Sequence, residues 1–292
     1  YGEPHIAVQQ DSDEGRRDFR RAAEEPVRRQ DMDNLRNNFD SVPQYEDGNK
    51  VHHLYLDESQ IAPGCILTSN LERTKVIADT FDKAQFMGQH REYITYTGEK
   101  HGVPMSVMSI GNGCMPTEIA VEELRHIKCN KMIKVGTCGA IQEDIEPGTI
   151  IVPTAACRCE GASLEYLNLQ YPAITDLDVL FAILDSAKQL GIKVLPGIIR
   201  THDALFLESL FAHDGMEERI RPWKELGVLA VDNEVSSMLT VASILGMQAG
   251  AVLVAVDNYT TKKSIDFEGQ YDKLISDAIE ISTRALAKLI GG

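Results

Sequence analysis

Three short segments of the sequence carry the residue types that could do chemistry. They are residues 111–113, 134–142 and 228–234, and each combines glycine, hydroxyl or charged side chains with a neighbouring apolar run. In a sheet wrapped by helices, ligands bind in the loops beyond the carboxyl ends of the strands. Backbone N–H groups and a few cations that converge there suit a small anion. We therefore expect these segments to contribute to one ligand site.

Lys134 is the charged residue in the most informative of these segments. It lies in the apolar run 132–135, at the expected end of a buried strand, where a charge is costly unless it is paired. Thr137 supplies a hydroxyl, and the glycines nearby let the backbone approach a ligand. Together these features predict part of an oxyanion site. The alternative is a lysine that extends to water at a sheet edge, and the residues alone leave it open.

The two other segments are open to a functional and a structural interpretation. Residues 228–234 run into Asp232 and Glu234, which would place carboxylates at the mouth of the sheet. Asp232 could equally cap the helix that follows, and a carboxylate such as Glu234 is favoured in a first helical turn. The glycines of 111–113 could offer N–H groups to an anion or turn the chain.

Composition excludes several classes of function. The 292-residue chain has a net charge of −15, which repels phosphate backbones and disfavours nucleic-acid binding. No apolar run approaches the roughly 18 residues that span a bilayer, so no membrane association is expected. The six cysteines suit reduced thiols in a cytoplasmic protein. Cys157 and Cys159 are too close for a zinc knuckle, and no metal site is predicted.

Short β-branched runs alternate with helical patterns after residue 50. Strands are expected at 65–68, 104–110, 132–135, 149–152 and 251–256, and helices at 116–127, 176–190, 234–245 and 270–290. This alternation predicts an α/β fold, a single domain with a central mixed β-sheet flanked by helices, over residues 51–292. Residues 1–50 form a charged N-terminal extension. It is either an arm for a protein partner or a sister subunit, or an extension without a role.

Six ordered motifs, taken together, indicate a family. They are residues 51–54, 90–93, 119–124, 136–142, 160–164 and 171–176. With them the chain resembles the nucleoside phosphorylases, most closely the uridine phosphorylase-like branch, from Val51 to the C-terminus. The resemblance implies attack of phosphate on the anomeric carbon of a nucleoside, uridine-like, as the base departs. The products would be free base and ribose 1-phosphate, in nucleotide salvage. Inorganic phosphate would be the co-substrate, with no other cofactor and no metal.

The resemblance also implies roles for particular residues of this sequence. The catalytic residues would be Glu234, Arg73 and Lys134. The phosphate would be held by Ser69, Arg73, Lys134, Thr137 and, from a neighbouring subunit, Arg91. The ribose would be held by Asp232, Asn233, Glu234 and, across the dimer interface, His53. The base would contact Cys138, Gly139, Phe206 and Asp257. The implied partners are nucleoside, phosphate and other copies of the chain, in a dimer or a hexamer of dimers.

Several positions depart from the family pattern. Ser69 replaces a glycine of the first phosphate loop, Lys134 an arginine, and Asn233 a methionine under the ribose. The loop 206–211 supplies neither the glutamine nor the arginine that reads uracil, and Tyr259 stands where a second arginine is expected. The sequence is therefore also compatible with a catalytically impaired homologue that serves as a scaffold or binding subunit. A hydrolytic relative is a third alternative.

Overall fold

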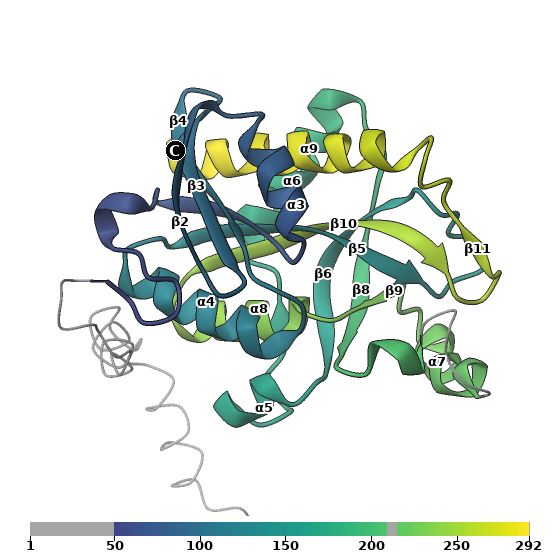
Figure 1. Cartoon of the computed structure of the whole chain (residues 1–292). Coiled ribbons are helices and arrows are strands. Elements are labelled where there is room, and N and C mark those ends of the chain that lie inside the picture. Colours follow the sequence, from purple (N-terminus) through teal and green to yellow (C-terminus); the bar gives the residue numbers. More distant parts are fainter. Residues whose placement is uncertain (1–49, 209–214, 292) are drawn as a thin grey trace, which may run out of the picture. The chain divides into compact units, whose positions relative to one another are not determined.

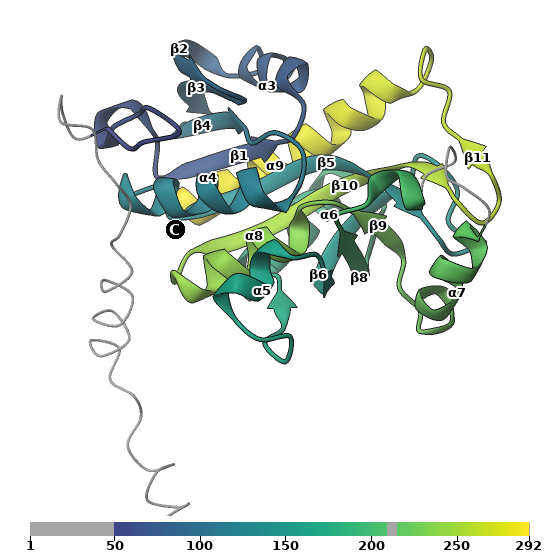
Figure 2. The ribbon, with the colours of Figure 1, turned by 60° about the horizontal axis from the view of Figure 1, so that its bottom comes forward.

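The computed structural model describes residues 50–208 and 215–291. Eleven strands of this part of the chain form one mixed sheet (Figures 1 and 2). The strands are β1 (Gly64–Thr68), β2 (Asp82–His90), β3 (Tyr93–Lys100), β4 (Val103–Ser109), β5 (Lys131–Ala140), β6 (Ile150–Cys159), β7 (Ala173–Ile174), β8 (Val194–His202), β9 (Ala230–Asp232), β10 (Gln248–Asn258) and β11 (Lys263–Ser264).

Strand β5 is the junction of the sheet. It pairs in parallel with both β1 and β10, and its last residues pair antiparallel with β9. Because β10 pairs with β6, β6 with β8 and β8 with β9, these five strands close on themselves. The strands β4, β3 and β2 extend the sheet beyond β1. The strand ends of the closed part therefore surround one region, where the candidate site lies.

Helices cover both faces of the sheet (Figure 1). Helices α6 and α9 pack together on one face, and α4 and α8 on the other, with an apolar core beneath each pair. No helix within the described residues is long and apolar enough to cross a membrane. The helices are α3 (Leu71–Ala78), α4 (Cys114–His126), α5 (Ala162–Tyr166), α6 (Leu177–Leu190), α7 (Met216–Glu225), α8 (Val235–Ile244) and α9 (Tyr271–Gly291), with short 3₁₀ turns η1 (Glu58–Gln60) and η2 (Leu205–Leu207).

The predicted fold class is confirmed, and the expected helices and strands are present with shifted ends. The elements that the sequence did not indicate include β2, β3 and β8. The residues of β2 are mostly exposed, so they lack the apolar alternation that marks a half-buried strand. The charged extension lies outside the described residues, apart from Lys50.

The expected end of the strand at Val135 is wrong, because β5 continues to Ala140. Its glycines, which were expected to let the backbone approach a ligand, lie inside the strand and also pack closely against neighbouring side chains. A Cβ atom built on Gly139 would lie 2.3 Å from the ring of Tyr259, and one on Gly136 would lie 3.1 Å from Lys134 Nζ. The ring of Tyr259 occupies the space of a side chain at Gly139, whereas a side chain at Gly136 would require Lys134 or Leu253 to shift slightly.

Replacing Glu118 on α4 by glutamine should stabilise the protein above pH 7. Burial, followed by the nearby charge of Glu122, raises the pKa of Glu118 from 4.5 to about 7, and its Oε2 has no hydrogen-bond partner among the described residues. A carboxyl with a raised folded-state pKa stabilises the fold below pH 4.5 and loses that contribution as the pH rises through 7. Melting temperatures should therefore be higher for Glu118→Gln than for wild type at pH 8 and equal at pH 4.5. An equal shift for Glu99→Gln, an exposed carboxylate on β3, would contradict this explanation.

Candidate active site

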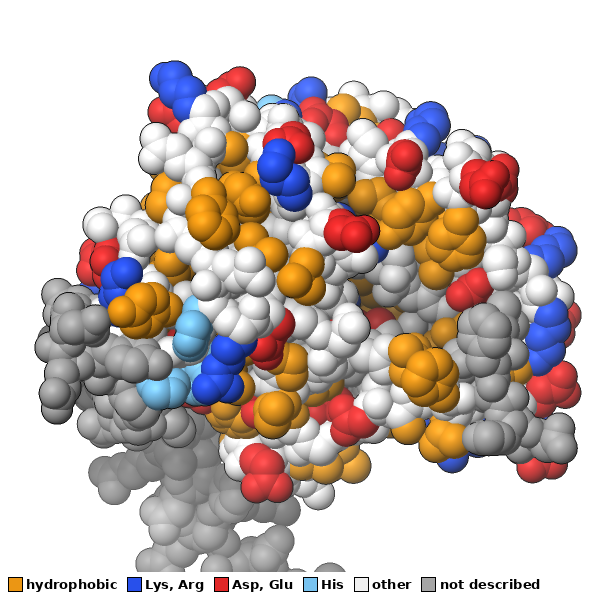
Figure 3. Space-filling model, viewed as in Figure 1, with side chains coloured by type: hydrophobic (Ala, Val, Ile, Leu, Met, Phe, Trp, Pro, Cys, Tyr) orange, Lys and Arg blue, Asp and Glu red, His pale blue; other side chains and the backbone are white. Residues whose placement is uncertain are grey.

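A cavity of about 360 Å³ opens where the ends of β1, β5, β9 and β10 meet the start of α4. Figure 3, viewed as in Figure 1, shows the surface hollowed near the middle of the view, between acidic and hydrophobic side chains. Residues of all three segments singled out in the sequence line it. The lining residues are Ser69, Asn112, Gly113, Thr137, Cys138, Gly139, Asp203, Leu205, Val231, Asp232, Asn233, Glu234, Val256, Asp257 and Tyr259.

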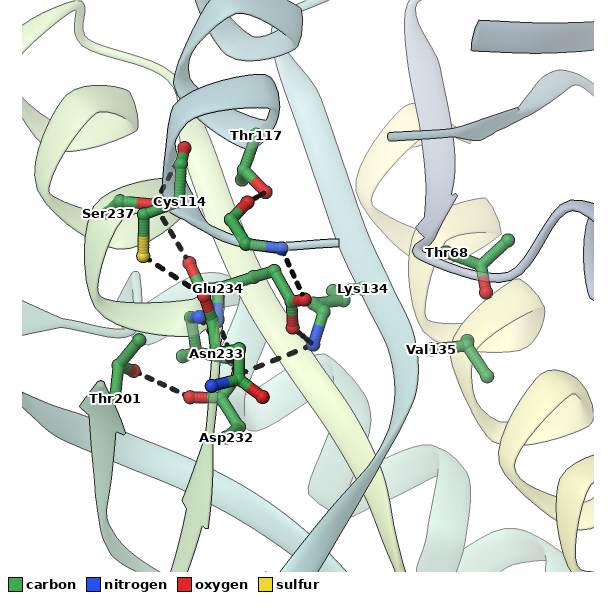
Figure 4. A network of polar contacts seen from close by, with 12 residues as sticks. Thr68, Cys114, Thr117, Lys134, Val135, Thr201, Asp232, Asn233, Glu234 and Ser237 are labelled. Carbon is green, nitrogen blue, oxygen red and sulfur yellow. Dashed lines mark hydrogen bonds and ion pairs between the residues drawn. The ribbon is translucent and has the colours of Figure 1, made fainter. Parts of the chain in front are cut away.

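Lys134 is buried beside this cavity and paired with two carboxylates (Figure 4). Its Nζ lies 2.8 Å from Glu234 Oε2 and 3.3 Å from Asp232 Oδ2, and its side chain is 1% exposed. The alternative of a lysine that extends to water is therefore wrong. Burial alone would lower the pKa of Lys134, but the charges of Glu234 and Asp232 outweigh it and raise this pKa above 10.5. The lysine is thus a fixed cation within the site.

Asp232 fits both interpretations that the sequence left open, a carboxylate of the site and a helix cap. Its Oδ2 accepts hydrogen bonds from the backbone N–H groups of Glu234 (3.2 Å) and Val235 (2.9 Å), at the start of α8. Its Oδ1 accepts one from Thr201 Oγ1 at 2.6 Å. The carboxylate therefore caps a helix and also anchors Lys134. Its contacts with β8, with the start of α8 and with β5 fix its orientation.

Glu234 is held at the cavity wall in one orientation. Its Oε1 accepts a hydrogen bond from the backbone N–H of Gly113 at 2.9 Å, and its Oε2 contacts Lys134. Gly113 has a φ of 94°, which favours glycine, and it precedes the first turn of α4. The glycine segment therefore positions a carboxylate in this structure. Asn233, beside it, donates from Nδ2 to the backbone carbonyl of His202 and also lines the cavity.

Arg73 lies close to the cavity but is not one of its lining residues. Its Nη1 donates to Thr68 Oγ1 (3.2 Å) and to the carbonyl of Val135 (3.4 Å), and its Nη2 donates to Tyr271 Oη (2.6 Å). The buried Nε–H has no partner among the described residues. A buried donor without an acceptor is costly, so this atom marks a place where a ligand oxygen would be favourable.

The structure does not bring every expected residue to the cavity. Cys138, Gly139 and Asp257 line it, whereas the side chain of Phe206 is 68% exposed and its neighbour Leu205 lines the wall instead. His53 lies elsewhere, with Nδ1 2.7 Å from Glu123 Oε1. Arg91 is exposed at the turn between β2 and β3. Both had been assigned to a neighbouring subunit, which a single chain does not test.

Several residues of the site had not been expected from the sequence. Asp203 and Leu205 follow β8, a strand that the sequence did not indicate, so their place at the cavity was not visible. Thr201 and Tyr271 support Asp232 and Arg73 from distant segments. A hydrogen bond across 198 residues leaves no local pattern in a sequence, so no signal could have found Tyr271.

Comparison with known proteins identifies the family. A family model described as the phosphorylase superfamily matches residues 64–288. The chain belongs to the phosphorylase superfamily. The resemblance to nucleoside phosphorylases is thereby confirmed, and this phosphorylase is an enzyme of the pentosyltransferase class.

Its relatives include enzymes named for two different nucleosides. The phosphorylase is 34% identical over 231 residues to a uridine phosphorylase of Thermococcus kodakarensis, covering 76% of this chain and 82% of that protein. It is 30% identical over 237 residues to a guanosine phosphorylase of Halorubrum lacusprofundi, covering 80% and 95%. A crystal structure of uridine phosphorylase from Vibrio fischeri superposes with a TM-score of 0.74 at 28% identity, covering 84% of this chain and 98% of that one.

Proposed function

We propose that this phosphorylase cleaves a nucleoside, uridine-like, with inorganic phosphate to give free base and ribose 1-phosphate, in nucleotide salvage. The observation that carries the proposal is the buried Lys134 between Asp232 and Glu234 at the wall of the cavity. A cation fixed beside a carboxylate can place a phosphate and a ribose side by side. No other cofactor takes part in this proposal.

Phosphate binds, in this proposal, where Arg73, Lys134, Ser69 and Thr137 converge. The unpartnered Nε–H of Arg73 supplies a charge-assisted donor, and Ser69 and Thr137 present hydroxyls at the cavity surface. Arg91 of a neighbouring copy would add a further cation. Because Lys134 also contacts two carboxylates, it contributes as a point charge more than as a directional donor.

The ribose lies against Glu234, Asn233 and Asp232, with His53 of a neighbouring copy at its 5′ end. Glu234 is held by Gly113 and Lys134, so its carboxylate requires little rearrangement as positive charge develops on the sugar ring. The base then occupies the remaining end of the cavity, near Cys138, Gly139 and Asp257, with Phe206 closing over it from outside.

A phosphate-dependent turnover assay with uridine, thymidine, inosine and adenosine tests this function. We expect cleavage of at least one nucleoside that requires phosphate and yields ribose 1-phosphate. Calorimetric titration with phosphate should show binding on the ~1 mM scale; no binding up to ~10 mM would remove the phosphate site from the proposal. Cleavage without phosphate would instead indicate a hydrolase.

One observation favours the second candidate function, a catalytically impaired homologue that acts as a scaffold or binding subunit. Lys134, the expected phosphate ligand, is already neutralised by two carboxylates. An absence of turnover with every nucleoside tested, together with unimpaired folding, would support this candidate.

We expect the protein to form at least a homodimer, in the cytoplasm, and to assemble as a dimer or a hexamer of dimers. His53 and Arg91 do not line the cavity of their own chain, which supports a role for them in the site of an adjacent copy. Two-fold pairing is also the commonest closed arrangement of identical chains. Light scattering should give at least twice the 32.3 kDa chain mass, whereas a single-chain mass in dilute solution would contradict the assignment of both residues.

A further inference from the structure

The guanidinium of Arg73 is a buried cation that keeps two N–H groups for a ligand. Arg73 is 7% exposed. A guanidinium carries five N–H groups, one on Nε and two on each of Nη1 and Nη2. Both groups of Nη1 donate, to Thr68 Oγ1 and to the carbonyl of Val135, and one group of Nη2 donates to Tyr271 Oη. Within the described part of the chain, Nε–H and the second N–H of Nη2 have no acceptor.

The three acceptors hold this guanidinium at two different nitrogens. Thr68 ends β1 and Val135 lies within β5, so the first two acceptors belong to strands that pair with each other. Both of them bind Nη1. A planar group held at one terminal nitrogen, on a flexible side chain, can still tilt about that point. The contact of Nη2 with Tyr271 Oη, at 2.6 Å, holds the other terminal nitrogen and therefore fixes the direction of the remaining N–H groups.

Tyr271 is itself held in place by the fold. It is the first residue of α9, which packs against β1, β5 and β10, and its ring contacts the apolar core on that face of the sheet. In the turn before the helix, the backbone N–H of Gln270 donates to the carbonyl of Asp266 at 2.9 Å. The ring of Phe267 lies 5.7 Å from the ring of Tyr271, between centroids. The hydroxyl therefore meets Arg73 from a fixed position.

The acceptors of Arg73 also connect it to the hydroxyls proposed for the phosphate. Ser69 follows Thr68 directly, Thr137 lies two residues after Val135, and both hydroxyl residues line the cavity. Arg73 is thus attached to the same two segments that present these hydroxyls. A cation whose donors are oriented before the anion arrives binds it more tightly, because less conformational freedom is lost on binding.

We infer that Tyr271 is a positioning residue for phosphate, because its hydroxyl orients the free N–H groups of Arg73. This inference rests on the proposed function, which assigns the phosphate to Arg73. Tyr271 does not line the cavity, so it acts through the guanidinium and not by contact with a substrate. The nucleoside contacts proposed at Glu234 and Asn233 do not involve it. Loss of the hydroxyl should therefore weaken phosphate binding and leave nucleoside binding unchanged.

Steady-state kinetics of Tyr271→Phe test the inference, because this substitution removes the hydroxyl and keeps the ring. KM for phosphate should rise about tenfold, the scale of one hydrogen bond to a charged group. KM for the nucleoside and kcat at saturating phosphate should change by less than about twofold, because the lost orientation affects phosphate equally in the ground state and the transition state. Tyr96→Phe is the matched control on β3, at a hydroxyl without a hydrogen bond to another described residue, and should leave all three unchanged.

A double-mutant cycle shows whether the hydroxyl acts through the guanidinium. In Arg73→Met, which removes the group that Tyr271 orients, adding Tyr271→Phe should change KM for phosphate by less than about twofold. A further tenfold rise in that background would overturn the inference, because the hydroxyl would then affect phosphate independently of Arg73. A joint loss of phosphate affinity, nucleoside affinity and melting temperature in Tyr271→Phe would also overturn it, since a purely structural contact of α9 would lower all three together.

Calorimetric titration with inorganic phosphate separates this inference from the proposed function. Tyr271→Phe should bind phosphate about tenfold more weakly than wild type, and this measurement requires no turnover. If phosphate binds with this difference but no nucleoside is cleaved, the proposed function fails and the positioning role of Tyr271 is supported. Equal phosphate affinity of the two proteins, or no phosphate binding by wild type up to ~10 mM, would overturn the inference.

Discussion

Replacing Glu234 by glutamine is expected to lower kcat/KM by about 100-fold or more, equivalent to about 2.7 kcal/mol of transition-state stabilisation. The carboxylate is 5% exposed and fixed by Gly113 and Lys134. Its charge favours the positive charge that develops on the ribose as the base departs, so the loss is concentrated in the transition state. Glutamine keeps the shape of the side chain and removes this charge. Steady-state kinetics with the preferred nucleoside at saturating phosphate measure the effect.

The matched control for this prediction is Glu99→Gln, the same substitution at an exposed position on β3. It should leave kcat/KM unchanged. If Glu234→Gln matched the wild-type enzyme, the ribose contact would be assigned to the wrong residue. A fall in activity that merely follows a fall in melting temperature would indicate a structural role, so both quantities should be measured on the same preparation.

Replacing Lys134 by methionine is expected to have the largest effect on stability, about 3–5 kcal/mol at pH 7, and to abolish phosphate binding. The substitution leaves Asp232 and Glu234 buried without their shared cation, and breaking one side of a buried ion pair costs this much. Chemical denaturation measures the free energy of unfolding, and calorimetry measures phosphate affinity. Lys131→Met, three residues earlier on β5 and partly exposed, should change neither by a comparable amount.

The effect of Lys134→Met should shrink at low pH. Burial raises the pKa of Asp232 above 3.8, and Lys134 opposes this rise. Without the lysine the folded-state pKa of Asp232 rises further. Protonation of Asp232 then stabilises the folded variant below pH 3.8, and this contribution is lost as the pH rises through the new folded-state pKa. The difference in unfolding free energy between wild type and variant should therefore narrow as the pH falls toward 4. A constant difference from pH 8 to pH 4 would contradict the role of the buried carboxylates.

Much of the fold follows from periodicity along the chain. The helix expected at 176–190 begins after Asp176, whose carboxylate accepts backbone hydrogen bonds, and ends before Gly191 with a φ of 68°. The apolar run 251–256 forms the centre of β10. By contrast, β2 and β8 were not expected, because their side chains alternate weakly between buried and exposed positions. Long-range pairing stabilises such strands, and the sequence of one segment does not indicate which other segment it pairs with.

The sequence by itself determined which residue types the site contains and which family it belongs to. Lys134, Thr137 and Glu234 could be singled out, because charges beside apolar runs and glycines beside hydroxyls are unusual enough to mark a site. The tertiary structure decided how they are used. It showed that Lys134 is buried between two carboxylates and that Gly113 holds Glu234. These relations depend on strand register and on contacts between residues far apart in the chain. A sequence pattern reports the preferences of a segment, whereas the partner of a buried charge depends on which segments the folded sheet brings together.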